Sequence, residues 1–194
     1  MKTIEFMGMP KSGKSTQLES LETILKQTNG KLVRIINEGA RICPFDKNNR
    51  FEYNAWSFHT TINRIIETKH SNFDYLLIDR GIYDHIAFTC ALGKSKEITA
   101  VQQITQLEYF KQFPYLEDSV LVFMVSPQEA MKREQKHYNL QGRVMNLPFL
   151  YRLYETYQQT IETIKHPIQL IDGSKEFSEN RKDILDYITQ TETT

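Results

Sequence analysis

The sequence predicts an α/β domain in which a five-stranded parallel sheet lies between two layers of helices. Five short apolar runs alternate along the chain with longer segments whose apolar residues recur at helical spacing. Such alternation is typical of a parallel sheet whose strands are joined by right-handed helical crossovers. A chain of 194 residues can bury a full-sized core, so we expect residues 1–194 to form a single domain.

The strands are expected where apolar residues are most continuous. The run 74–79 (DYLLID) is nearly all apolar before its last residue, as expected for a strand that helices cover on both faces. The full set of expected strands is 3–7, 31–37, 74–79, 118–125 and 168–171.

The helices are predicted from apolar periodicity and from start and stop signals. Gly30 ends the first helix, because glycine readily adopts the left-handed conformation that closes one. Ser126 at an N-cap and Pro127 at the next position form a strong helix start. The tail 189–194 has nothing to bury and is expected to fray. The full set of expected helices is 15–26, 51–69, 83–92, 97–113, 127–135, 147–165 and 176–188.

Bulk composition restricts the class of protein. Lys plus Arg and Asp plus Glu number 24 each, so the surface as a whole is poorly suited to coating nucleic acid or an anionic membrane. Cys43 and Cys90 match no metal-binding spacing, which indicates a reducing compartment. No signal peptide precedes the first strand, and no apolar run reaches membrane-spanning length. We therefore expect a cytoplasmic protein that has no membrane partner.

A glycine-rich loop between the first strand and the first helix carries the clearest chemical signal. It reads Gly8-x-x-x-x-Gly13-Lys14-Ser15, the P-loop pattern that binds nucleoside triphosphates. The glycines let backbone N–H groups converge on anionic oxygens, the lysine reaches the β- and γ-phosphates, and the serine hydroxyl can bind Mg²⁺. The residues expected to bind the phosphates of ATP are Gly8, Met9, Pro10, Lys11, Ser12, Gly13, Lys14, Ser15 and Thr16.

Charged side chains follow the next two strands at their carboxyl ends. Glu38 and Arg41 follow the second predicted strand, while Asp79 and Arg80 close the third. Ligands of open parallel sheets bind at the carboxyl ends of the strands. We therefore expect these four residues to converge with the P-loop at one edge of the sheet.

These features together resemble the P-loop kinases of nucleosides and nucleotides, with deoxynucleoside kinases and thymidylate kinases as the nearest groups. The segment 79–88 (DRGIYDHIAF) follows the layout of deoxynucleoside kinases, which carry Glu-Arg-Ser there and a later Phe-Ala, whereas thymidylate kinases carry Asp-Arg-Tyr. The segment 147–157 (LPFLYRLYETY) looks like the helix that follows the lid in deoxynucleoside kinases. The resemblance covers residues 1 to about 188. It implies the three-layer α/β/α P-loop NTPase fold with a helical lid at about 133–146.

The resemblance implies that the γ-phosphoryl group of ATP is transferred, with Mg²⁺, to a nucleoside or a nucleoside monophosphate. Lys14 would neutralise charge at the donor, while Ser15 and Asp79 would hold the metal. Arg80 would bridge phosphoryl oxygens of donor and acceptor. Asp79 could instead only cap the helix that follows, and Arg80 could form a surface salt bridge. The family also includes many dimers, so a homodimer is consistent with the resemblance.

The sequence leaves the role of Glu38 open. Deoxynucleoside kinases carry a glutamate at the end of the second strand, where it accepts the proton of the sugar 5′-hydroxyl. That glutamate is commonly followed by proline, whereas Gly39 follows here. Glu38 could also position the substrate or the metal, or be a surface carboxylate. Arg41 could reach an acceptor phosphate, which keeps a monophosphate acceptor open.

Aromatic residues on the second and third predicted helices could line a flat pocket for a base. Trp56 and Tyr83 are the first candidates, followed by Phe58, His59 and Phe88. Aromatic residues at helical spacing fit ordinary core packing equally well. The resemblance also assigns Asp84, next to Tyr83, to the substrate.

Basic residues flank the polar stretch after the fourth predicted strand. Arg133, Lys136 and Arg143 occupy the position of the family's lid, whose arginines close over the phosphates and exclude water. Arg133 and Arg143 are therefore candidate catalytic residues. The alternative is a solvated basic face.

Two other functions are consistent with the P-loop. A kinase could act on a nucleic-acid end or a nucleotide-sugar, although the neutral net charge argues against a nucleic-acid end. An ATP-binding regulator would need no acceptor, but Glu38, Arg41 and Arg80 would then have no evident role.

Overall fold

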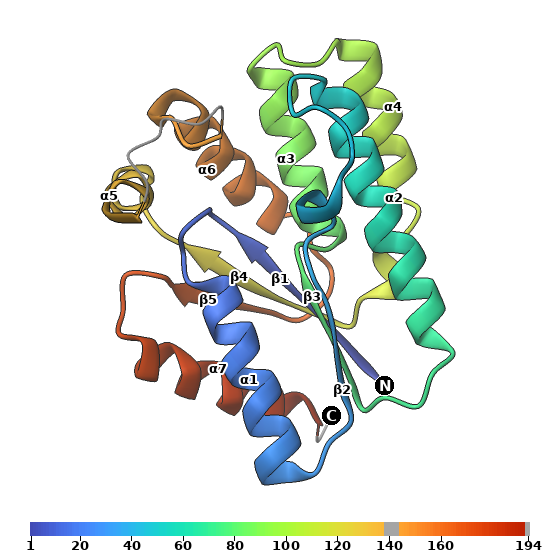
Figure 1. Ribbon diagram of the computed structural model, residues 1–194, viewed down its shortest axis with the longest axis vertical. Helices are drawn as coiled ribbons and strands as arrows, with labels where there is room; N and C mark the ends of the chain where they lie inside the picture. The colour runs from blue at the N-terminus through green and yellow to red at the C-terminus, as the bar shows by residue number, and fades with distance from the viewer. Residues whose placement is uncertain (138–143, 193–194) are drawn as a thin grey trace.

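The computed structural model describes residues 1–137 and 144–192, and its strands form one parallel sheet, as the sequence predicts (Figure 1). The strand order is β2-β3-β1-β4-β5, so the first strand lies in the middle of the sheet. The register of β1 and β3 runs from Lys2 opposite Tyr75 to Phe6 opposite Asp79. The strands are β1 (Lys2–Gly8), β2 (Val33–Ile36), β3 (Tyr75–Asp79), β4 (Ser119–Met124) and β5 (Ile168–Asp172).

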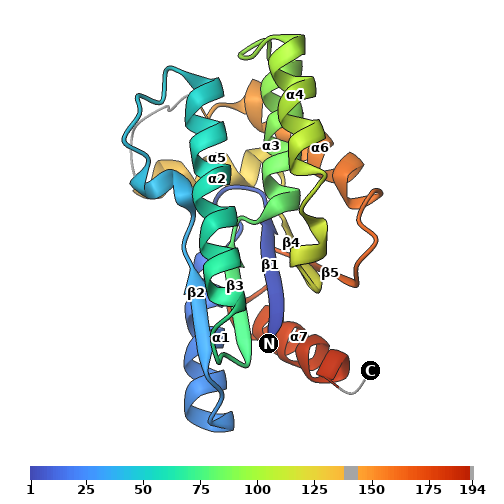
Figure 2. The same cartoon turned by 90° about the vertical axis from the view of Figure 1, so that its right-hand side faces the viewer.

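Helices cover both faces of the sheet, which gives the expected three layers (Figures 1 and 2). On one face, Ile4 and Phe6 of β1 pack against apolar residues of α1 and α7. Side chains alternate along a strand, so Met7 packs on the opposite face, in the cluster that contains Tyr157 of α6. The helices are α1 (Lys14–Asn29), α2 (Arg50–Lys69), α3 (Ile82–Lys94), α4 (Ala100–Phe110), α5 (Pro127–His137), α6 (Leu147–Ile161) and α7 (Phe177–Glu192).

Several helix boundaries differ from the prediction. The helix expected at 97–113 begins at Ala100, because Thr99 and Gln102 form a reciprocal capping box. The helix expected at 147–165 ends at Ile161, where the N–H of Thr163 already turns back to the Thr160 carbonyl. α7 continues to Glu192, beyond the expected end at 188, while the last two residues lie outside the described part of the chain. The expected fraying of 189–194 stays a prediction.

The topology brings three loops to one edge of the sheet. β1 is followed by the P-loop, β2 by a short 3₁₀ helix, η1 (Gly39–Ile42), and β3 by Arg80 and Gly81. A second 3₁₀ helix, η2 (Pro114–Leu116), leads into β4. Because all strands are parallel, the carboxyl ends of β1, β2 and β3 lie at the same edge of the sheet. This is the edge that the sequence predicts from the charged residues that follow the second and third strands.

Candidate active site

The loop between β1 and α1 has the backbone that its glycines predict. Gly8 and Gly13 have φ angles of 129° and 93°, in the range that favours glycine. A Cβ atom at Gly8 would lie 2.1 Å from the carbonyl oxygen of Phe123, so no side chain fits there. α1 begins at Lys14, directly behind the loop, so the positive end of the helix lies beside the cavity that the loop lines.

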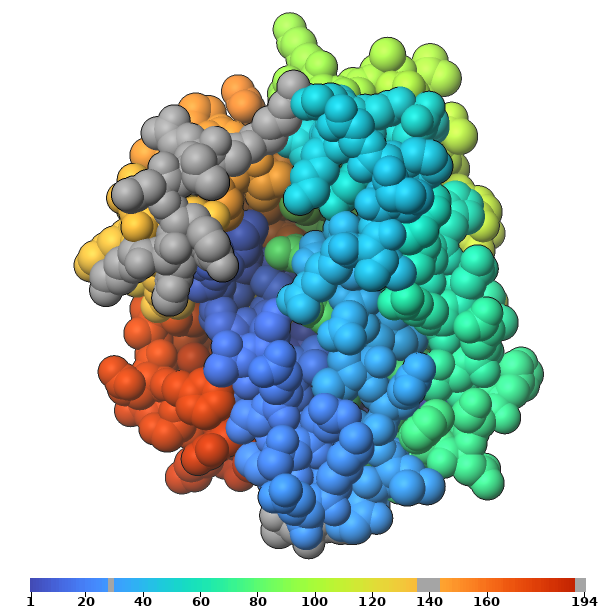
Figure 3. Space-filling view, in the orientation of Figure 1, coloured from blue at the N-terminus to red at the C-terminus, as the bar shows by residue number. Residues whose placement is uncertain are grey.

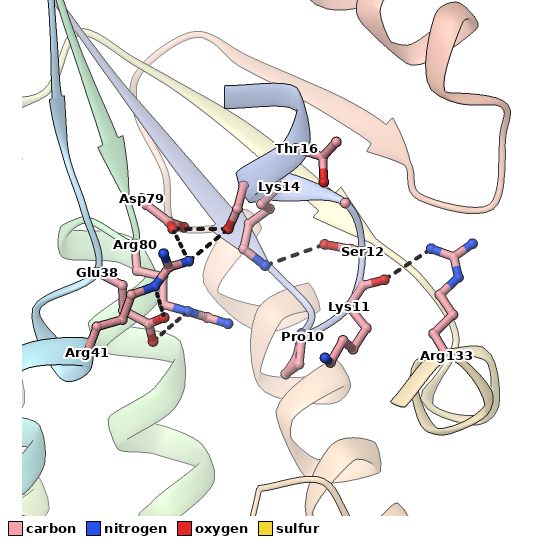
Figure 4. A pocket seen from close by; sticks show the side chains of 12 residues that line it. Pro10, Lys11, Ser12, Lys14, Thr16, Glu38, Arg41, Asp79, Arg80 and Arg133 are labelled. Carbon is pink, nitrogen blue, oxygen red and sulfur yellow. Dashed lines mark hydrogen bonds and ion pairs between the residues drawn. The ribbon is translucent and has the colours of Figure 1, made fainter. Parts of the chain in front are cut away.

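Lys14 folds back over the loop, as Figure 4 shows. Its ammonium donates to the carbonyl oxygens of Gly8 at 2.8 Å and Met9 at 2.7 Å, and to Ser12 Oγ at 3.4 Å. Burial, and then the nearby charge of Arg80, lowers the pKa of Lys14 to about 7. A buried ammonium bound to neutral carbonyls gains stabilisation when an anion enters the loop.

Ser15 and Asp79 form a pair of oxygen ligands beside the loop. Ser15 Oγ lies 3.2 Å from Asp79 Oδ2, and Nη2 of Arg41 lies 3.1 Å from the first oxygen and 3.2 Å from the second. A positive charge from η1 therefore already lies against the two oxygens that would suit Mg²⁺. The described residues hold no cluster of three or more His, Cys, Asp and Glu that could cage a metal. Mg²⁺ typically binds through one or two carboxylates together with substrate phosphates, so Asp79 with Ser15 could hold it without such a cage.

Arg80 lies at the centre of the charged cluster. Its φ of 66° is left-handed, which is uncommon for a residue other than glycine. Its Nε lies 3.0 Å from Glu38 Oε1, and its Nη1 lies 2.8 Å from Asp84 Oδ2. Burial acts to lower the pKa of Arg80, but the carboxylates of Asp84 and Glu38 raise it well above its usual range. Arg80 therefore remains a cation shared between two carboxylates.

Asp84 joins the P-loop to Arg80, a role that the assignment to substrate does not anticipate. Its buried Oδ1 accepts hydrogen bonds from the Gly8 N–H at 3.0 Å and from the Tyr157 hydroxyl at 2.7 Å. Burial acts to raise the pKa of Asp84, but the cations of Arg80 and Lys14 hold it below its usual value. Sequence reasoning misses Tyr157, because its position on α6 is that of an ordinary core tyrosine.

Two cavities meet at this cluster, and Figure 3 shows the surface hollowed between the blue P-loop region and the cyan segment that leads into α2. The first cavity has a volume of about 620 Å³ and follows the P-loop from Pro10 to Thr16, with Glu38, Arg41, Asp79, Arg80 and Arg133 around it. The second has a volume of about 460 Å³ and extends between α2 and α3. Both are lined by Pro10, Lys11, Glu38 and Arg80.

Three residues that line the second cavity carry buried polar atoms without a partner among the described residues. Arg50 Nη2, Ser57 Oγ and His85 Nε2 are buried, line this cavity, and make no hydrogen bond with the described residues. Burial lowers the pKa of His85 to about 4, so its imidazole is neutral at pH 7. Buried polar groups in native proteins normally have partners, so we expect a polar ligand to supply them.

Hydrogen bonds fix the orientation of two further groups in this wall. Arg50 Nε is held by Glu97 Oε2 at 2.7 Å, and Asn54 Nδ2 donates to Gln106 Oε1 at 3.0 Å. The Asn54 amide nitrogen is therefore engaged, and its carbonyl oxygen is the atom available to a ligand. The spacing of Arg50, Asn54 and Ser57 places them on one face of α2. That polar stripe is the sequence signal that could have identified this wall.

The aromatic residues expected to line a base pocket are mostly elsewhere. Trp56 is not among the residues that line either cavity, because it lies about 100° around α2 from Ser57. Tyr83 lines a separate cavity toward α4 and α6, and Phe58 and His59 pack against aromatic residues of α4. Phe88 does line the second cavity. The structure therefore places neither Trp56 nor Tyr83 in the two cavities beside the P-loop, and their role in a base pocket stays a prediction.

Arg133 lies at the rim of the first cavity, where a lid residue is expected. Its Nη1 donates to the Lys11 carbonyl at 3.0 Å, and its Nε pairs with Glu129 Oε1 at 2.8 Å. The side chain of Lys136 and all of Arg143 lie outside the described residues, so their lid roles stay predictions.

The sheet order, the P-loop and the flanking helices define the fold as that of the P-loop deoxynucleoside kinases. Solved structures of deoxyadenosine kinase from M. mycoides have this fold. The structure with the products dCMP and a flexible dCDP superposes with a TM-score of 0.77, at 16% sequence identity over 97% of this chain and 99% of that one. The structure with dATP gives 0.76 at 16% identity over 96% and 99%, and the one with dCTP gives 0.74 at 16% over 97% and 99%.

Comparisons of the amino-acid sequence found no match. No protein-family model matches the chain, and no curated protein matches its sequence. Within the described residues, no helix has the length and apolar character needed to cross a membrane. The likeness to the kinase structures is therefore a likeness of fold.

Proposed function

We propose that this protein is a kinase that transfers the γ-phosphoryl group of ATP to a nucleoside 5′-hydroxyl or to a nucleoside monophosphate, with a nucleoside as the favoured acceptor. The observation that carries this proposal is the junction of two cavities with Glu38 and Arg80 on their common wall. Phosphoryl transfer depends on positioning and on positive charge around the migrating group, and needs little covalent help. The nucleotides bound in the M. mycoides deoxyadenosine kinase structures support the same class of ligand.

The donor half of the reaction is assigned to the first cavity. The triphosphate of ATP lies against the backbone N–H groups of the P-loop and the positive end of α1. Lys14 exchanges the Gly8 and Met9 carbonyls for β- and γ-phosphate oxygens. Ser15 and Asp79 would hold Mg²⁺, which neutralises phosphate charge when it is bound.

The acceptor half is assigned to the second cavity, and the carboxylate of Glu38 at its junction with the first cavity favours an alcohol. The side chain of Glu38 is 28% exposed and lies at the junction, where a carboxylate can accept the proton of a hydroxyl. Arg80 is already paired with Glu38 and Asp84. Further basic residues that line this cavity are Lys11, Lys47 and Arg50. This lining admits a monophosphate as well, but only a hydroxyl acceptor needs the base that Glu38 can supply, which favours a nucleoside.

An acceptor panel tests this proposal. The purified protein is incubated with Mg²⁺ and γ-labelled ATP together with nucleosides, nucleoside monophosphates, oligonucleotides and nucleotide-sugars. We expect label on the 5′-hydroxyl of one or more nucleosides, with monophosphates as the next acceptors. Label on an oligonucleotide end or on a nucleotide-sugar would identify a different kinase. Tight ATP binding without transfer to any acceptor would contradict the proposal and favour a regulator.

Ser57 offers a direct test of the acceptor cavity. Its hydroxyl makes no hydrogen bond with the described residues, so Ser57→Ala removes no hydrogen bond among them. We expect the KM for the acceptor to rise about 2- to 12-fold, the equivalent of one hydrogen bond of about 0.5–1.5 kcal/mol. The KM for ATP and the melting temperature should stay unchanged. Thr60→Ala on the same helix is the matched control, and an equal effect from both variants would exclude Ser57 from the cavity.

A further inference from the structure

Two glutamates from distant parts of the chain meet beneath the active site. Glu5 of β1 and Glu117, which follows η2, are 0% and 1% exposed. Neither belongs to the P-loop or to the cavities described above. They lie at the N-terminus of α3, the helix that directly follows Arg80 and Gly81.

The two carboxyl groups cap α3 completely. Oε1 of Glu5 accepts hydrogen bonds from the N–H groups of Gly81 at 3.0 Å and Asp84 at 2.8 Å, and its Oε2 accepts from Tyr83 at 3.0 Å. Oε1 of Glu117 accepts from Ile82 at 2.9 Å. The first N–H groups of a helix have no partner within it. Here these two side chains supply all four.

The arrangement leaves one place for a proton. A Cβ at Gly81 would lie 2.2 Å from Glu117 Oε1 and 2.8 Å from Glu5 Cδ, so the two buried carboxyl groups lie next to one another. Two acids this close in a buried site favour a state in which one of them is protonated. Both oxygens of Glu5 accept backbone N–H groups, whereas Oε2 of Glu117 receives none from the described residues. The proton is therefore assigned to Oε2 of Glu117, the carboxyl oxygen of the pair that accepts no backbone N–H from the described residues.

The ionisation of the pair follows from burial. Burial raises the pKa of Glu5 to about 7 and raises the pKa of Glu117 well above its usual range, where the adjacent Glu5 carboxylate raises it further. The other ionisable groups that face the pair are Asp84, Asp118 and Tyr83. Burial raises the pKa of Tyr83 to about 12, so its hydroxyl stays neutral.

We propose that Glu5 and Glu117 share one proton and are positioning residues that hold Arg80 against the reacting groups. The Arg80 N–H is bound to the Phe6 carbonyl at 3.1 Å, and the next N–H, that of Gly81, is bound to Glu5. A Cβ at Gly81 would lie 2.2 Å from Glu117 Oε1, so the acid pair packs directly on this turn. The left-handed backbone of Arg80 is thereby fixed from both sides.

Two amide substitutions test the pair, because their effects should differ. In Glu117→Gln the amide nitrogen can replace the donating hydroxyl while the amide oxygen still accepts from Ile82. In Glu5→Gln the amide N–H must face a backbone N–H, because both oxygens of Glu5 are acceptors. We expect Glu117→Gln to keep the melting temperature and kcat within about 2-fold. Glu5→Gln should lower kcat more than about tenfold, with little change in the KM for ATP.

The shared proton has a signature that needs no substrate. Between pH 7 and 8 the folded wild-type protein holds a proton that the unfolded chain has lost, so this group stabilises the fold less as pH rises. The ratio of the wild-type to the Glu117→Gln unfolding constant, from urea titrations, should therefore rise about tenfold per pH unit. Asp118→Asn, at the neighbouring exposed carboxylate, should keep the wild-type slope.

The two measurements separate the parts of the proposal. Identical pH slopes in wild type and Glu117→Gln would overturn the shared proton. A wild-type kcat in Glu5→Gln would overturn the positioning role, which rests on the proposed kinase function. Absence of any acceptor for the wild-type protein would refute that function, while the unfolding measurement would still decide the shared proton.

Discussion

Replacing Lys14 with alanine is expected to lower kcat by a factor of about 10²–10³ or more, the usual cost of removing one group that stabilises a developing charge. The Lys14 ammonium is bound to the Gly8 and Met9 carbonyls, where it is poised to move onto phosphate oxygens. Burial strengthens its interaction with an anion, because water does not screen the charge. Initial rates of phosphoryl transfer at saturating ATP and acceptor measure this effect.

The control for Lys14→Ala must separate the loss of charge at the site from the loss of a lysine in general. Lys26 lies at the other end of α1 and forms an exposed ion pair with Glu22 at 2.6 Å. Lys26→Ala should leave kcat unchanged, since exposed pairs of this kind contribute little. Melting curves establish that both variants are folded. A folded Lys14→Ala protein with wild-type turnover would show that the loop is not a phosphate donor site.

Replacing Glu38 with glutamine is expected to lower kcat by about 10²–10⁴, the range for loss of a general base, with little change in the KM for a nucleoside. Glutamine keeps the shape of the side chain and an oxygen that can face Arg80, but it cannot accept a proton. Arg80 keeps its second partner, Asp84 at 2.8 Å, so the cluster should stay assembled. The measurement is kcat against pH for the best nucleoside found in the acceptor panel.

A second acceptor and a control variant test whether the effect of Glu38→Gln comes from loss of a general base. With a nucleoside monophosphate as acceptor, the same substitution should have a much smaller effect on kcat, because a phosphate oxygen is already anionic. Glu52→Gln, at an exposed residue in the first turn of α2, should leave both reactions unchanged. An unchanged kcat for the nucleoside in Glu38→Gln would remove the general-base role and leave Glu38 as a partner of Arg80.

The residues of α2 that line the second cavity could not be predicted from the apolar periodicity of the sequence. The periodicity of α2 is compatible with an aromatic pocket around Trp56, yet the polar stripe of Arg50, Asn54 and Ser57 faces the cavity. Periodicity gives the faces of a helix but not the partner of each face. That partner is decided when α2 packs against α3, because packing determines which face is covered and which borders a cavity.

The hydrogen-bond networks between side chains of different elements could likewise not be predicted from the sequence. Glu5 reads as an isolated charge within an apolar strand, and Tyr157 as one aromatic residue among several on a helix. Each gains its role from a partner that is distant in the chain. Glu5 meets Glu117 beneath α3, and Tyr157 meets Asp84 and Arg80.

The sequence by itself determines the five-stranded α/β architecture and the P-loop to which we assign the donor half of the proposed reaction. Strand and helix periods are local, and the P-loop holds its glycines, Lys14 and Ser15 in one contiguous segment. The convergence of Glu38, Arg41, Asp79 and Arg80 also follows, because parallel strands end at a common edge. Only the tertiary structure decides the second cavity, the double pairing of Arg80 and the buried acid pair. The polar stripe of α2 marks one wall in the sequence, but the residues that face it, and the partners of Arg80 and Glu5, depend on which side chains of separate elements come within hydrogen-bonding distance.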